Sequence, residues 1–94
     1  MYAVVGHVTI DLGRSDEAEK QLNEMVLPMF KKANGFVSGV WSHNDADGKG
    51  VSIVVFESEE DAQAVVTQMQ AMGPLPDSPV TLDRVEVYRV SATA

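Results

Sequence analysis

Residues 36–56 read FVSGVWSHNDADGKGVSIVVF, and they give the clearest indication of the fold of this chain. Two runs rich in β-branched and aromatic residues, 36–43 and 50–56, flank a polar loop. Within that loop, Asp47-Gly48 is a dipeptide that readily turns the chain, because glycine adopts positive φ at little cost. The pattern therefore predicts a β-hairpin.

A helical period lies on each side of this hairpin. The helix before it should start at Ser15 as its N-cap and end at Asn34-Gly35. The helix after it should be capped by Ser58, with Asp61 as capping partner, and end at Gly73-Pro74. Each helix has one apolar stripe, formed by Ala18, Leu22, Met25, Val26 and Met29 in the first and by Ala62, Val65, Val66, Met69 and Met72 in the second.

Pro28 interrupts the first of these helices. Proline has no backbone N–H, and its ring crowds the carbonyl group four residues earlier, here that of Glu24. We therefore expect a kink or a break near Leu27.

Strands at both ends of the chain complete the pattern. Residues 2–10 alternate, with Val4 and Val8 on one side, and residues 80–90 form a final strand around Val85 and Val87. The resulting β-α-β-β-α-β order predicts an α+β, ferredoxin-like fold: a four-stranded antiparallel sheet with two helices on one face.

The sheet face away from the helices is expected to be apolar as well. Three strands carry apolar residues at both parities: Val5 beside Val4, Trp41 beside Val40, and Val55 beside Val54. An exposed apolar sheet face is a liability or an interface. We therefore expect a homodimer in which two such faces meet around a closed, barrel-like interior.

Composition limits the possible partners. The 94 residues should form a single domain, residues 1–94, with a net charge of −7. Seven scattered Lys and Arg residues make nucleic acid and an anionic membrane surface poor partners. The absence of cysteine excludes thiolate chemistry and Cys-based metal sites. With no leader and no apolar run near the ~20 residues of a membrane span, a cytoplasmic location is expected.

Few side chains suggest chemistry. His7 and Tyr88 are the catalytic candidates, as a base and a phenol donor, although each can equally be a structural strand residue. Arg84, Glu86 and Arg89 could orient an acidic ligand, but alternating charges more often form cross-strand pairs on a solvated edge. His43, next to the hairpin loop, is expected to be solvated.

The candidate ligand-binding residues are apolar. Trp41 is the single tryptophan and is either a pocket wall or a core or interface anchor. Met25, Met29 and Met69 fit core packing, and their flexible side chains would also adapt to an apolar ligand. No metal site is expected, because the Asp45–Gly48 loop lacks the glutamate that a calcium loop needs at its twelfth position.

Three segments carry a resemblance to a known family. They are 2–5 (YAVV), 28–41 (PMFKKANGFVSGVW) and 54–62 (VVFESEEDA). Together they resemble the antibiotic-biosynthesis-monooxygenase-like branch of the dimeric α/β-barrel superfamily. The resemblance implies a homodimer with a pocket between sheet and helices in each protomer. The family that the chain resembles includes cofactor-free oxygenases that act on aromatic polyketides, and haem-degrading enzymes.

Haem degradation by the known route is not expected for this chain. The resemblance implies an Asn on the first strand and a Trp and a His on or after the second helix. The position of the Asn falls at about Gly6 in this chain, and that of the Trp at about Val65. No histidine follows His43. We expect no bound cofactor.

Two functions remain open. The first is binding of a small apolar or aromatic molecule in a pocket between sheet and helices. The second is a cofactor-independent monooxygenase that acts on an aromatic or quinone-like substrate with His7, Trp41 and Tyr88. A purely structural role as a dimerisation module is a third possibility.

Overall fold

The computed structural model of the protein describes residues 1–73 and 76–94. The elements in chain order are β1 (Tyr2–Ile10), a 3-10 turn (Leu12–Arg14), α1 (Ser15–Gln21), a π-helical turn (Leu22–Val26), α2 (Leu27–Lys31), β2 (Phe36–His43), β3 (Lys49–Phe56), α3 (Glu59–Met72) and β4 (Val80–Arg89). α1, the π-turn and α2 form one continuous helical path, so the predicted β-α-β-β-α-β order is confirmed.

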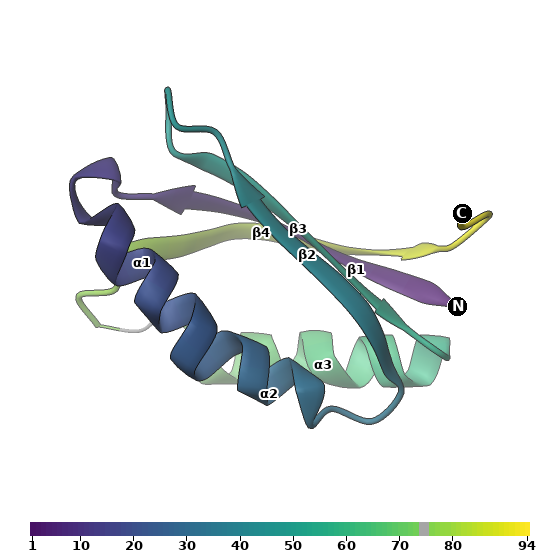
Figure 1. Ribbon diagram of the computed structural model, residues 1–94. Helices are drawn as coiled ribbons and strands as arrows, with labels where there is room; N and C mark the ends of the chain where they lie inside the picture. The colour runs from purple at the N-terminus through teal and green to yellow at the C-terminus, as the bar shows by residue number, and fades with distance from the viewer. Residues whose placement is uncertain (74–75) are drawn as a thin grey trace.

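The four strands form one antiparallel sheet in the order β2-β3-β1-β4. Both helical segments lie on the same side of this sheet, and the opposite side carries no described segment (Figure 1). The two chain ends meet where β1 begins and β4 ends, and there the Val90 N–H donates to the Met1 carbonyl at 2.9 Å. The predicted ferredoxin-like α+β fold is therefore present.

The core fills the space between the sheet and the helices. Val4 and Val54 are direct cross-strand partners and are 2% and 1% exposed. Phe56 is fully buried and makes an edge-on contact with Phe36, at 6.3 Å between ring centroids. The helices add the remaining buried members of this cluster, Phe30, Ala62, Val65 and Val66.

The first helical path bends at a π-turn just before Pro28. The Leu27 N–H bonds to the carbonyl of Leu22, five residues back, and α2 then begins with proline in its first turn. A π-turn admits one extra residue, which lets the chain accommodate a proline that cannot donate and that would clash in a regular helix. The predicted irregularity near Leu27 is confirmed, and its form is a π-turn.

Helix starts agree with prediction in one case and differ in the other. Ser58 Oγ accepts from the Asp61 N–H at 3.1 Å and donates to the Asp61 carboxylate at 2.9 Å, so the predicted cap of α3 is confirmed. The prediction that Ser15 is an N-cap is wrong. The Asp11 carboxylate instead accepts from the Gly13 N–H and starts a 3-10 turn, and Ser15 continues that turn into α1.

Glycines with positive φ close the predicted turns. Gly35 follows the first helical path at φ +75°, and Gly48 turns the hairpin at the same φ. A side chain at Gly48 would also meet the carbonyl oxygen of Ile10, 2.3 Å from the Cβ position. α3 ends at Met72 with Gly73 at φ +66°, while Pro74, the other half of the predicted stop, lies outside the described residues.

In the part of the chain that the structure describes, no helix is long and apolar enough to cross a membrane.

Candidate functional site

A cavity of about 600 Å³ lies between the helices and the sheet, beyond the end of the packed core. It is bounded by the first helical path, the C-terminal half of α3 and the helix-facing side of all four strands. The side chains that line it include Leu22, Val26, Met29, Phe30, Trp41, His43, Ser52, Met69, Met72 and Leu82. This volume is within the ~300–1,000 Å³ typical of small-molecule sites.

The cavity walls are mostly apolar and aromatic. Trp41 from β2 packs against Phe30 from α2, with ring centroids 5.6 Å apart and planes inclined at 50°. Leu82 and Met72 also line the cavity, although they are 42% and 55% exposed. Large apolar side chains that border a cavity without being covered gain free energy when an apolar ligand covers them.

The floor of the cavity is one cross-strand row of the sheet. Trp41 on β2 pairs with Ser52 on β3, which pairs with Gly6 on β1. The neighbouring row contains the buried pair Val4 and Val54. Trp41 and Ser52 line the cavity whereas Val4 and Val54 are buried, so the packed core ends between these two rows.

His43 stands at the rim of the cavity. Its Nε2 lies 3.0 Å from a carboxylate oxygen of Asp45, and its side chain is 23% exposed. The sequence predicted a solvated histidine and missed this position. The alternation of side chains along the strand could have indicated this position, because His43 and Trp41 are two residues apart and therefore share a sheet face.

The predicted site residues separate into two groups. Trp41, Met29 and Met69 line the cavity. Met25 does not: it is 57% exposed, because the π-turn changes the helical phase around it. His7 and Tyr88 lie on the opposite face of the sheet, since His7 has the parity of Val5 and Tyr88 pairs with Ala3. The structure therefore brings neither His7 nor Tyr88 to Trp41.

His7 and Tyr88 belong instead to a charged cluster on the open face. His7 Nε2 lies 2.9 Å from Glu86 Oε1, and Tyr88 Oη donates to Glu86 Oε2 at 2.8 Å. Arg84 adds two contacts, 3.2 Å from its Nη2 to His7 Nε2 and 3.5 Å from its Nε to Glu86 Oε1. The predicted cross-strand pairing of Glu86 is thus confirmed.

This cluster shifts two pKa values in opposite directions. The hydrogen bonds from Tyr88 and His7 stabilise the carboxylate and lower the pKa of Glu86. The same carboxylate holds the phenol proton and raises the pKa of Tyr88. The cluster acts as a polar, hydrogen-bonded unit on the sheet surface.

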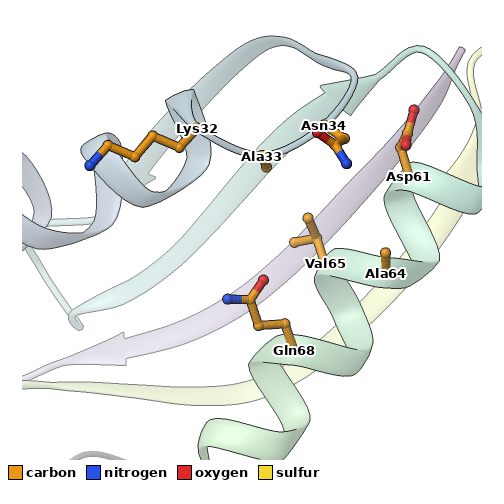
Figure 2. A pocket seen from close by; sticks show the side chains of 7 residues that line it. All are labelled: Lys32, Ala33, Asn34, Asp61, Ala64, Val65 and Gln68. Carbon is orange, nitrogen blue, oxygen red and sulfur yellow. The ribbon is translucent and has the colours of Figure 1, made fainter.

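A second, smaller hollow of about 270 Å³ lies between the end of α2 and α3. Figure 2 shows that the Lys32 amine points away from Asn34 and Asp61. Asp61 is already bonded to Ser58 as part of the helix cap. The polar groups that line this hollow therefore do not converge on one point. Among the described residues, no group of three or more His, Asp or Glu side chains is placed to hold a metal ion.

The chain belongs to the antibiotic biosynthesis monooxygenase family, whose sequence profile matches residues 1–68. A search of curated protein sequences found no relative at the significance required.

Solved structures show the same fold at low sequence identity. The haem degrader MhuD of Mycobacterium tuberculosis, solved with two haems in its active site, is 15% identical, with a TM-score of 0.75 over 100% of this chain and 99% of its own. HapK of Hahella chejuensis is 7% identical, with a TM-score of 0.67 over 100% and 97%. A monooxygenase from the ActVA-Orf6 gene of Streptomyces coelicolor, in complex with nanaomycin D, is 13% identical, with a TM-score of 0.61 over 99% and 89%.

Proposed function

We propose that this protein binds a small apolar or aromatic molecule in the cavity between its sheet and its helices. The observation that carries the proposal is the cavity itself, about 600 Å³ with Trp41, Phe30 and Met29 in its walls. No polar or charged residue among those described is fully buried, so a charged ligand would find no desolvated partner. Relatives of the same fold were solved with haem or nanaomycin D, both of which contain large flat ring systems.

We also infer that two copies join through their open sheet faces. The β2-β3 half of that face exposes an apolar strip in which Val40, Val51 and Ile53 are 64%, 38% and 45% exposed. The β1-β4 half carries the His7, Glu86 and Tyr88 cluster. An apolar strip beside satisfied polar groups is the composition of a protein interface.

Native mass spectrometry of the freshly purified protein tests both statements. A dimer that carries a co-purified small molecule supports the assembly and identifies the ligand class. An empty dimer supports the assembly alone, and the cavity is then tested with added aromatic probes. A monomer at micromolar concentration contradicts the proposed dimer.

The second candidate function is a cofactor-independent monooxygenase that acts on an aromatic or quinone-like substrate. The observation that favours it is His43 at the cavity rim with Asp45 3.0 Å from its Nε2. A histidine oriented by a carboxylate is the usual arrangement of a general base. Removal of a proton from a phenolic substrate gives an electron-rich anion that can reduce dioxygen. One oxygen atom then enters the substrate as a carbonyl oxygen, and the other leaves as water.

The two histidines give a direct test, because they lie on opposite faces of the sheet. Oxygen consumption with 1,8-dihydroxyanthrone as substrate should fall by about 100-fold or more in His43→Gln, the range expected for loss of a general base. His7→Gln should leave the rate within about 2-fold. If His7→Gln alone lowers the rate, catalysis involves the open face, and the cavity assignment is wrong.

Haem degradation by the route of the family's haem-degrading members is not proposed. The first-strand position expected to carry Asn is Gly6, where a Cβ would already lie 2.7 Å from Ser52 Oγ. The chain also has only two histidines, His7 and His43, and neither follows the second helix.

A further inference from the structure

We propose that the Ser52 hydroxyl is the hydrogen-bonding anchor of the cavity and selects ligands that carry a neutral oxygen on a flat ring. This inference rests on the proposed function, because it concerns how the same cavity chooses its ligand. Three features of the structure support it: the position of Ser52, the lack of a partner for its hydroxyl, and the space left around it.

Ser52 is placed where the packed core ends and the cavity begins. On β3 the helix-facing residues run from Phe56 through Val54 to Ser52, and the first two are 0% and 1% exposed. A valine at the third position would continue the core. The chain instead has a serine directly opposite Trp41.

On the sheet floor of the cavity, the Ser52 hydroxyl has no hydrogen-bond partner among the described residues, and the half-buried Ser15 at the start of α1 is a second lining hydroxyl without one. Several other polar groups that line the cavity are paired. His43 contacts Asp45, Gln21 bonds Ser78, and the Ser42 hydroxyl donates to the Val51 carbonyl. Glu19, Gln70 and Thr81 are solvent-exposed, so water satisfies them. Within residues 1–73 and 76–94 no side-chain polar atom is both buried and unpaired, so the Ser52 oxygen must be accessible from the cavity. A free hydroxyl among apolar walls gains most from a ligand that pairs with it.

The cavity of about 600 Å³ that Ser52 lines leaves room for such a ligand. Gly6, its partner on β1, has no Cβ, and the Ser52 hydroxyl lies over it: a Cβ there would be 2.7 Å from Ser52 Oγ and 3.6 Å from a methyl group of Leu82. The Trp41 ring leans along its own strand, so that its Cη2 would lie 2.5 Å from a Cβ on Gly39. The ring is therefore directed along β2 toward Gly39, and a flat ligand can rest against the indole while its oxygen reaches Ser52.

The chemistry of serine defines the ligand class. A hydroxyl both donates and accepts, so it pairs with a ring carbonyl or a phenol. The described residues that line the cavity include no Lys or Arg, so a carboxylate or phosphate at this point would be desolvated without a counter-charge. The anchor therefore favours neutral oxygen substituents.

A matched pair of probes tests the anchor. Calorimetry compares 1-naphthol with 1-methylnaphthalene, which replaces the hydroxyl with a methyl group of similar size, and the single indole N–H signal of Trp41 in the NMR spectrum reports binding in the cavity. The wild-type protein should bind 1-naphthol about 3- to 10-fold more tightly, the range for one neutral hydrogen bond. Ser52→Ala should abolish this preference without weakening 1-methylnaphthalene.

Two further variants make the result specific. Gly6→Ala keeps the hydroxyl but places a methyl group against it, so it should also reduce the preference. Ser38→Ala, on the exposed face of β2, should retain it. If Ser52→Ala keeps the preference for 1-naphthol, Ser52 is not the anchor while the cavity still binds. If neither probe binds or moves the Trp41 signal, the proposed function fails and the anchor with it.

Discussion

The two faces of the sheet carry similar residues in different surroundings. On β3, Val54 and Phe56 are almost completely buried beneath the helices, whereas their neighbours Val51 and Ile53 are 38% and 45% exposed on the other side. The side chains are comparably apolar, so hydrophobicity alone does not distinguish them. The difference is which face the helices cover, and it leaves the open face with apolar surface for another molecule to bury.

The two faces also differ in their polar groups. The open face holds the His7, Arg84, Glu86 and Tyr88 cluster, in which the groups satisfy one another. On the helix-covered face, the Ser52 hydroxyl lines the cavity without a hydrogen-bond partner among the described residues. A satisfied cluster has little left to offer a small ligand, while an unpaired hydroxyl beside a cavity does.

The largest expected effect tests the contrast in burial. Phe56→Ala should lower the free energy of unfolding by about 3–5 kcal/mol, because it leaves a cavity beneath the helices. Ile53→Ala should cost less than about 1 kcal/mol in the monomer, because the side chain is already half in water. Urea denaturation at several protein concentrations separates folding from association. Equal losses for the two variants would mean that the two faces are equally buried in the monomer.

An intermediate effect concerns the proposed interface. Ile53→Lys places a charge in the apolar strip, and burial of an unpaired charge should raise the dimer dissociation constant by about 100-fold. Sedimentation velocity measures this constant. Thr67→Lys, on the exposed side of α3, is the matched control and should leave it unchanged. A dimer that tolerates Ile53→Lys must use another surface.

The smallest effect concerns the charged cluster. The lowered pKa of Glu86 means that its contribution to stability is present above its ordinary value of 4.5 and is lost as the pH falls through the lowered value. The stability difference between wild type and Glu86→Gln should therefore be larger at pH 7 than at pH 3, as measured by urea denaturation. A difference that is the same at both pH values would show that the carboxylate charge does not contribute.

Tyr88→Phe checks the cause of that shift. The Tyr88 hydroxyl makes the largest contribution to lowering the pKa of Glu86, so its removal should return this pKa toward 4.5. An NMR titration that follows the side-chain carboxyl carbon measures the change. No movement would mean that His7 and Arg84 hold the carboxylate without the phenol.

Local patterns predicted most of the fold. The Asp47-Gly48 turn, the Ser58 cap and the alternation of Val4 and Val5 each depend on neighbours a few residues away, and each is present in the structure. Ser15 failed as a cap because Asp11 competed for the same role four residues earlier. Met25 left the predicted stripe because a π-turn changed the helical phase, which a fixed period of 3.6 residues cannot represent.

The candidate site was only partly predictable. Met29 and Met69 lie on apolar helix stripes that must face the sheet, and Trp41 is a large aromatic residue on a strand, so the sequence indicated all three as candidates, and all three line the cavity. The sequence did not indicate Ser52 and His43 as cavity-lining residues, because a serine or a histidine in a strand is commonly a surface residue. Parity places both on the face of Trp41, but whether core or cavity lies above them depends on where the helices sit.

The order of strands and helices, the parity of each strand and the family can be read from the amino-acid sequence, since they follow from local periodicity and turn chemistry. Which face the helices cover depends on the tertiary structure. The tertiary structure also separates His7 and Tyr88 from Trp41, and it places the cavity above Ser52. The physical reason is that a strand offers alternate residues to two faces, and only packing between distant segments determines which face becomes core, cavity or open surface.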